Sequence, residues 1–291
     1  MLDSVGLLLR WLAAQDSPEL VVISCAKAPA ISTPPGAINA ILTGCIAQES
    51  DGVAAQILAV GARQVSIHTC GIHKDAETKK ASIWKNATPG LVTDFHPTRK
   101  RLFRQGKTIS LPHVPLPRRA VLGFKITSPI DFHADDQERT AQAIEALSIS
   151  DPDQVFSAPK GVQLDANGCT LCGVCVKACK NDALQIQTDT NNGRERVEKL
   201  VLSQRLCRGC HSCIDLCPVG ALEATQPQTW RTLQDPEAQL LFQSETRKCK
   251  NCGARIKSID RELCALCVHR QENPFQSVPL DSVRKLLRAR E

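Results

Sequence analysis

The chain has 291 residues and a formal charge of +6, with 15 cysteines against one methionine, three tryptophans and no tyrosine. An odd number of cysteines, most of them in C-x-x-C pairs, argues against a disulfide framework and for metal ligation in a reducing compartment. The first residues lack a basic region ahead of their apolar run, and no stretch approaches about 18 uninterrupted apolar residues. We therefore expect neither a signal peptide nor a membrane span, and predict a cytoplasmic protein of two or three domains.

Residues 1–95 are predicted to form a small α/β domain. The apolar runs LVVISC, INAILTGC and RQVSIHTC are typical of strands, and they end in Cys25, Cys45 and Cys70. Between the second and third runs, residues 53–60 have apolar side chains at helical spacing. A strand, helix, strand order implies a parallel sheet. All three cysteines would then lie at the carboxyl edge, where open α/β sheets place their binding sites.

The segment AAQILAVGARQVSIHTCGIH resembles the small delta subunit of methyl-viologen-reducing hydrogenases, an iron–sulfur domain that passes electrons between larger proteins. A cluster such as 2Fe-2S on the three cysteines would need a fourth ligand, for which His68, His73 or an exogenous thiol are the candidates. Two alternatives remain open: the cysteines are small buried apolar residues, or the domain is a docking domain that has lost its cluster. No G-x-G-x-x-G or P-loop motif indicates NAD, FAD or ATP binding.

Residues 96–159 are predicted to be a proline-rich, basic linker followed by a helix. Five basic residues fall between Arg99 and Lys107. Regular structure is disfavoured further on by Pro112, Pro115 and Pro117. The basic stretch has two readings, a docking strip for an acidic partner or a solvated linker. In DDQERTAQAIEALS, one helical face carries Thr140, Ile144 and Leu147.

Residues 160–227 contain two cysteine groups with one spacing, C-x2-C-x2-C-x3-C, and Pro218 follows the second. This internal repeat resembles the bacterial ferredoxin fold with two 4Fe-4S clusters, in which the fourth cysteine of each group ligates the other cluster. The resemblance implies one cluster on Cys169, Cys172, Cys175 and Cys217. It implies a second cluster on Cys207, Cys210, Cys213 and Cys179. The alternative is zinc at both groups, although zinc needs four tetrahedral ligands and not this tripled loop.

The chain departs from the ferredoxin pattern in two places. Lys180 stands where that family usually has proline, which leaves a backbone N–H and a positive charge near the Cys179 sulfur; either would raise the potential of that cluster. The longer gap before the second group is predicted to be a hairpin that turns at Asn191, Asn192 and Gly193. His211, inside the second loop, would tune a cluster by hydrogen bonding or simply face solvent.

Residues 244–291 carry a third cysteine group with the spacing C-x2-C-x11-C-x2-C, formed by Cys249, Cys252, Cys264 and Cys267. Gly253 suits a metal knuckle, because the chain must turn there through positive φ. The group resembles a zinc ribbon or treble clef, and a structural metal would supply folding energy that so short a segment lacks. A third iron–sulfur cluster and a rubredoxin-like iron are the alternatives. The end of the chain predicts a basic amphipathic helix carrying Val283, Leu286 and Leu287, which would pack on the protein itself or on a partner.

The metal sites change the meaning of the positive charge. A four-thiolate zinc site and each oxidised four-iron cluster with its thiolates carry about −2. Three such centres bring the formal +6 close to zero. The basic residues are therefore predicted to balance metal sites, and nucleic acid is not an expected partner.

Together these features predict an α+β multidomain electron-transfer protein, a non-catalytic subunit rather than an enzyme. In layout it resembles the ferredoxin-type accessory proteins of molybdenum or tungsten formate dehydrogenases. That resemblance implies a larger redox enzyme of this or the hydrogenase type as partner, with another electron carrier. Two alternatives remain: a maturation factor that uses its spare cysteines to insert metal, and a redox-sensing nucleic-acid binder.

Overall fold

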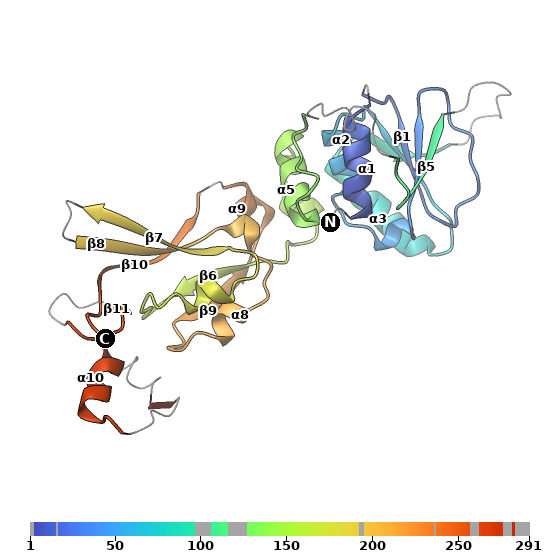
Figure 1. Cartoon of the computed structure of the whole chain (residues 1–291). Coiled ribbons are helices and arrows are strands. Elements are labelled where there is room, and N and C mark those ends of the chain that lie inside the picture. The colour runs from blue at the N-terminus through green and yellow to red at the C-terminus, as the bar shows by residue number, and fades with distance from the viewer. Residues whose placement is uncertain are drawn as a thin grey trace. The chain divides into compact units, whose positions relative to one another are not determined.

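The chain forms two compact units, Met1–Ser157 and Ala158–Glu291 (Figure 1). The computed structural model describes residues 3–15, 17–96, 106–115, 127–191, 195–235, 237–256, 262–275 and 281–282. Most of the predicted basic strip after Arg99, the hairpin turn at Asn192 and Gly193, and the predicted terminal helix with Val283, Leu286 and Leu287 lie outside these ranges. Within them, no helix combines the length and the apolar character needed to cross a membrane.

The first unit is built on a five-stranded sheet in the order β4-β3-β1-β2-β5, with every neighbouring pair parallel. The predicted small parallel sheet is thus confirmed. Its central strand is buried along its whole length, as expected for a parallel sheet. The strands are β1 (Val21–Ser24), β2 (Ile38–Ile41), β3 (Val65–His68), β4 (Val92–Asp94) and β5 (Lys107–Ser110).

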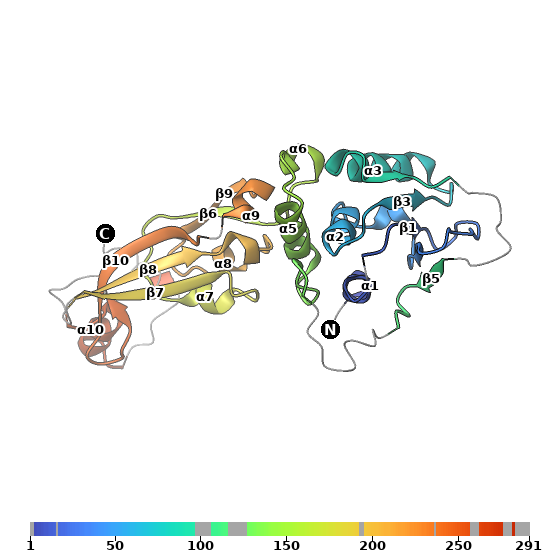
Figure 2. The ribbon, with the colours of Figure 1, turned by 90° about the horizontal axis from the view of Figure 1, so that it is seen from above.

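Helices pack against this sheet and against one another (Figure 2). The predicted helix between the second and third strands is α2, and the chain leaves it at Gly61, whose φ is +111°. The predicted helix near Thr140 is α5, which packs on α2. The helices are α1 (Ser4–Ala13), α2 (Val53–Ala59), α3 (Lys74–Ala87), α5 (Asp136–Ala146) and α6 (Pro152–Val155), with a 3-10 turn η1 (Ile46–Gln48).

Part of the predicted linker, residues 96–159, belongs to the first unit. Strand β5 pairs with β2 in the register Ile38↔Lys107 to Ile41↔Ser110. Only Ile109 of this edge strand is buried, so its sequence KTIS lacks the apolar run by which strands are recognised. The predicted basic linker thus includes an edge strand that the sequence did not indicate, whereas α5 is the helix expected after it.

The second unit begins with the segment that carries the first two cysteine groups. Strand β6 (Val162–Ala166) pairs with β9 (Leu222–Pro227), and between them the chain forms the short helices α7 (Val174–Ala178) and α8 (Ser212–Asp215). The predicted hairpin is confirmed, since β7 (Leu184–Asn191) and β8 (Glu195–Leu202) pair antiparallel along their length. The remaining short elements are the 3-10 turn η2 (Gln204–Leu206) and α9 (Trp230–Gln234).

Strand β10 joins the hairpin to the third cysteine group. It runs over Gln239–Lys248, pairs antiparallel with β8, and ends one residue before Cys249. A short strand β11 (Arg255–Ile256) then pairs with its last two residues, and α10 (Ala265–Glu272) completes the module. Arg255 donates from Nε to the buried Glu198 of β8 at 2.8 Å. The third cysteine group is therefore anchored on the same sheet as the hairpin.

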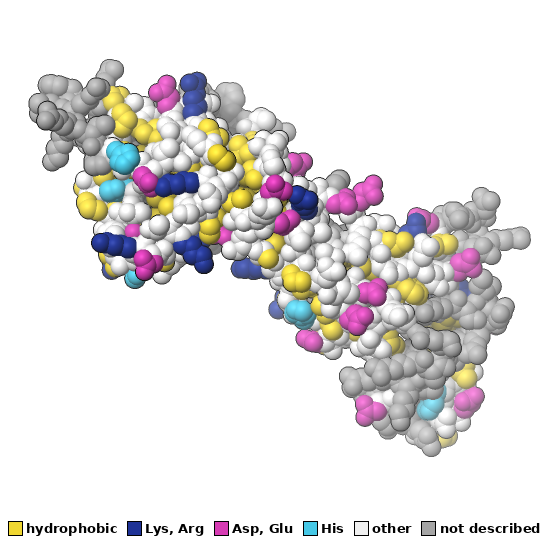
Figure 3. Space-filling model, turned by 180° about the vertical axis from the view of Figure 1, so that it is seen from behind, with side chains coloured by type: hydrophobic (Ala, Val, Ile, Leu, Met, Phe, Trp, Pro, Cys, Tyr) yellow, Lys and Arg dark blue, Asp and Glu magenta, His cyan; other side chains and the backbone are white. Residues whose placement is uncertain are grey.

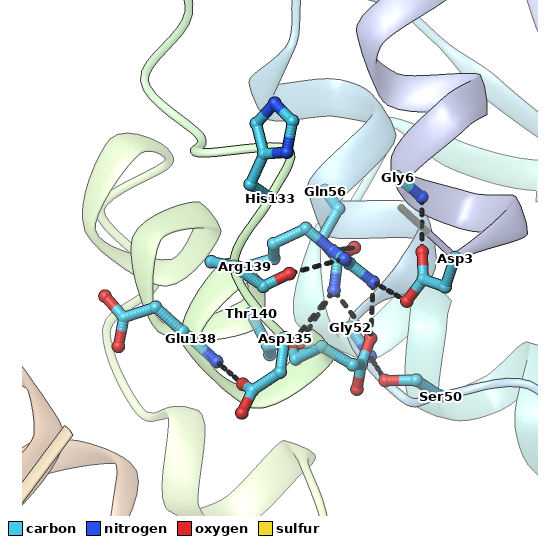
Figure 4. A network of polar contacts seen from close by, with 12 residues as sticks. Asp3, Gly6, Ser50, Gly52, Gln56, His133, Asp135, Glu138, Arg139 and Thr140 are labelled. Carbon is cyan, nitrogen blue, oxygen red and sulfur yellow. Dashed lines mark hydrogen bonds and ion pairs between the residues drawn. The ribbon is translucent and has the colours of Figure 1, made fainter. Parts of the chain in front are cut away.

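A buried arginine connects α5 to the rest of the first unit (Figure 4). Arg139 is 2% exposed. Its guanidinium donates to the Ala134 carbonyl and to Asp3 Oδ2, both at 2.7 Å, and its Nε donates to Gln56 Oε1 at 3.3 Å. Gln56 in turn donates to Thr140 Oγ1 at 2.9 Å. One side chain thus links α1, α2 and α5.

We expect Arg139→Leu to lower the free energy of unfolding of the first unit by about 2–4 kcal/mol, because the buried Gln56 loses a donor and the Ala134 carbonyl and Asp3 lose theirs as well. The measurement is urea unfolding by tryptophan fluorescence in a Trp230→Phe background, which leaves Trp11 and Trp84, both in this unit. The control is Lys85→Leu, which removes a more exposed ion pair with Asp94 and should cost about 0–1 kcal/mol. Equal effects of the two changes would contradict the role given to Arg139.

Candidate metal centres

The two cysteine loops of the second unit repeat one backbone conformation. Leu171 and Gly173 have φ of 54° and 79°, and the matching Gly209 and His211 have φ of 63° and 59°. In each loop these positive values flank the second cysteine. The sequence repeat is therefore also a conformational repeat, although glycine occupies a different one of the two positions in each loop. His211 is exposed.

Each loop faces its own cavity, and the fourth cysteine of each group lies at the cavity of the other. One cavity is lined by the thiol-bearing residues Cys169, Cys172, Cys175 and Cys217. The second is lined by Cys207, Cys210, Cys213 and Cys179. The structure thus brings together the same two sets that the ferredoxin resemblance implied.

The sulfur atoms of each set are close enough to repel one another as thiolates. Burial raises the pKa of Cys175 to about 12, and the neighbouring Cys169, Cys172 and Cys217 contribute to the rise. Burial likewise raises the pKa of Cys213 to about 11, with contributions from its own set. Thiolates gathered in this way need a cationic centre among them to stay ionised.

Backbone amides complete both sites. The backbone N–H of Leu171 donates to Cys169 Sγ at 3.4 Å. The backbone N–H groups of Ala183 and Ala221, which occupy equivalent positions in the two halves of the repeat, donate to the sulfurs of Cys179 and Cys217 at 3.3 Å. Apolar side chains from the hairpin, including Leu184, Leu200 and Leu202, close the space around the loops. Sulfur ligands, amide donors and an apolar surround together fit an iron–sulfur cluster.

Lys180 acts on the second set of thiols. It is exposed and follows Cys179 in the chain. The pKa of Cys210 is lowered, first by hydrogen bonding to Ser212 and also by the charge of Lys180. The positive charge at the position of the missing proline therefore acts on the Cys210 thiol of the second cavity.

The third cysteine group has the dimensions of a site for one ion. The sulfurs of Cys249, Cys252, Cys264 and Cys267 all lie within 4.8 Å of one another, and those of Cys252 and Cys264 are 3.6 Å apart. Four sulfurs bound tetrahedrally at about 2.3 Å would be about 3.8 Å apart. The predicted positive φ of Gly253 is confirmed at +72°.

Donors to sulfur also surround this group. The backbone N–H of Cys264 donates to Cys249 Sγ at 3.2 Å, and Asn251 Nδ2 donates to Cys267 Sγ at 3.4 Å. Hydrogen bonding from the Cys252 backbone, with smaller contributions from Cys264 and Asn251, lowers the pKa of Cys249 to about 6 against the opposing effect of burial. A thiolate at this position is thus stabilised before any metal binds.

In the first unit, the cysteines at the three strand ends also meet. Their partner is a residue that the sequence did not single out: ligand atoms of Cys25, Cys45, Cys70 and Glu77 all lie within 4.8 Å of one another. Neither candidate histidine belongs to this group. His68 Nε2 lies 2.9 Å from the Pro29 carbonyl oxygen and the ring packs edge-on against Phe95. His73 precedes α3 and lines the cavity beside the cysteines.

Comparison with known proteins identifies the central segment. Residues 168–221 match the 4Fe-4S dicluster domain family, so this part of the chain is a ferredoxin-type segment. Over 58 residues the chain is 38% identical to the Polyferredoxin protein MvhB of Methanothermus fervidus. The match covers 19% of this chain and 14% of the length of that relative. Both findings support a role in electron transfer.

The exchanged cysteines can be tested by deleting one loop at a time. With Cys169, Cys172 and Cys175 replaced by alanine, the remaining four-iron signal in low-temperature electron paramagnetic resonance should vanish or become a three-iron signal on Cys179→Ala. The same background should tolerate Cys217→Ala, because that sulfur lines the emptied cavity. The converse pattern would show that each group binds its cluster with its own fourth cysteine.

Proposed function

We propose that the chain relays single electrons through two 4Fe-4S clusters between a larger redox enzyme and another electron carrier. The partner enzyme is of the molybdenum or tungsten formate dehydrogenase type or of the hydrogenase type. The observation that carries the proposal is the exchange of Cys179 and Cys217 between the two thiol-lined cavities. Because helices α7 and α8 of the two loops pack on each other, the exchange keeps the two centres adjacent.

A bound four-iron cluster supplies reversible one-electron chemistry. The chain offers routes by which electrons could enter and leave the clusters, since Cys172 of the first set and Cys210 of the second are both exposed. Exposed apolar side chains adjoin ligands of both sets, with Leu216 beside Cys217 and Leu206 beside Cys207. On the face drawn in Figure 3, basic and acidic side chains are interspersed, which does not favour a nucleic-acid partner.

The third cysteine group is proposed to hold one structural zinc ion. Its four sulfurs have nearly the spacing of a tetrahedral thiolate site. In the part of this module that the structure describes, the core around them is small, with Ile256 and Ala265 among the few apolar side chains buried near the cysteines. So little apolar surface cannot hold the module together without the metal.

We expect about eight iron and eight acid-labile sulfide per chain after anaerobic purification. A relay should retain both through repeated cycles of chemical reduction and reoxidation, with metal content measured after each cycle. Transfer of a cluster to an acceptor protein during cycling would instead support the maturation alternative. A value near twelve iron without zinc would place a third cluster on Cys249, Cys252, Cys264 and Cys267.

Lys180→Met should lower the midpoint potential of one cluster only, the one at Cys207, Cys210 and Cys213. The positive charge of Lys180 favours the reduced state of the cluster, which is the more negative one. Because Lys180 is exposed, its removal should lower the midpoint potential by roughly tens of millivolts. Redox titration followed by electron paramagnetic resonance measures both potentials. Lys180→Arg, which keeps the charge, is the control. An equal shift in both variants would show that the charge does not set the potential.

A further inference from the structure

The site in the first unit lies where ligand sites of open α/β sheets are found. The strand order reverses at β1, which has β2 on one side and β3 on the other. Cys25 directly follows β1, Cys45 follows β2, and Cys70 follows β3. This carboxyl edge at the switch point is the position at which such sheets bind ligands. A cavity of about 200 Å³ opens there, lined by all three cysteines and by Lys27, Thr43 and His73.

The four ligand atoms have the spacing of a site for a single ion. The sulfurs of Cys25 and Cys45 are 3.8 Å apart, and Glu77 Oε1 lies 3.3 Å from Cys45 Sγ and 3.0 Å from Cys70 Sγ. A zinc ion with three sulfur ligands and one carboxylate oxygen would give edges of about 3.5–3.8 Å. The edge between Cys25 and Cys45 already matches that tetrahedron, and all four ligand atoms lie within 4.8 Å of one another.

Glu77 is held in place as a metal-binding carboxylate would be. It is 2% exposed, on the buried face of α3. Its Oε2 accepts from the N–H of Gly71 at 3.0 Å, and its Oε1 accepts from the N–H of His73 at 3.2 Å. Such outer contacts orient ligands in metal sites. Among the ion pairs of the described residues none includes Glu77, so its charge is offset by hydrogen-bond donors, which include the thiols of Cys45 and Cys70.

We propose that Cys25, Cys45, Cys70 and Glu77 bind one divalent ion of the zinc class, with Glu77 as the fourth ligand. The backbone N–H of Ile46, which points at Cys25 Sγ at 3.4 Å, supports a thiolate there. The ligand atoms surround one ion too closely to leave room for two irons and their bridging sulfides. Zinc has no redox chemistry, so the first unit would lie outside the electron path. It would add a second zinc site to the one proposed for the third cysteine group.

The test uses the full chain with Cys252→Ser and Cys264→Ser, which disables the third cysteine group. This chain should retain one zinc by elemental analysis. X-ray absorption at the zinc edge should show three sulfurs at about 2.3 Å and one oxygen or nitrogen near 2.0 Å. A shell of four sulfurs, or a chain without zinc whose first unit is folded by tryptophan fluorescence, would overturn the proposal. So would about two iron and two sulfide beyond the eight of the ferredoxin segment.

Two matched variants then test the fourth ligand. In the same background, Glu77→Gln should weaken zinc binding at least tenfold in a competition titration with a chromophoric chelator. Asp75→Asn is the control, because it removes an exposed carboxylate from the same turn of α3 and should leave the affinity unchanged. Equal affinities of the two variants would remove Glu77 from the site.

Discussion

Mutual repulsion among gathered sulfur ligands is the constraint on which much of this structure depends. In the second unit Cys169 and Cys175 belong to the same buried cluster as Leu200 and Leu202. A thiolate in such a place is opposed by burial and by its neighbours. The backbone N–H groups that point at sulfur offset only part of this cost. The loops therefore need a positively charged centre in each of the two cavities to keep their cysteines ionised.

The first unit is stabilised by an apolar core and does not depend on a metal centre for its fold. Its sheet and helices bury a conventional apolar core, which includes Ile23, Ile57 and Ile144. The Arg139 network fastens α5 to that core without involving any cysteine. The thiols and Glu77 lie at one edge of a scaffold that has its own source of stability. Loss of metal should thus affect the two units unequally, the second in its folding and the first at a single edge.

What could be predicted from the sequence depended on whether the information was local. The loop spacing, the turn at Gly253 and the helix α2 follow from residues within one turn or loop of each other. Glu77 does not, because its contact with Cys45 and its place beside Cys25 exist only once three strands and α3 have assembled. One sequence signal was available: Glu77, Ala81 and Trp84 share the buried face of α3. A carboxylate in an otherwise apolar stripe indicates a buried partner.

The strands that were missed share a second cause. Strand β5 has one buried side chain, and β10 alternates weakly between exposed and half-buried positions. Neither carries the apolar pattern by which strands are recognised. Both pair with a neighbouring strand, β5 with β2 and β10 with β8. Tertiary pairing of this kind leaves little trace in the local sequence.

Strand β10 also limits how the chain can change in length. Leu241 and Phe242 pack against the cluster-bearing core, and the same strand ends at the knuckle of Cys249. Side chains alternate between the two faces of a strand. One added or deleted residue would therefore move every side chain beyond it to the opposite face of the sheet. The register of its pairing with β8 already shifts between Leu240 and Phe242. Among relatives with the same layout, this strand should keep its length, whereas surface loops elsewhere are free to vary.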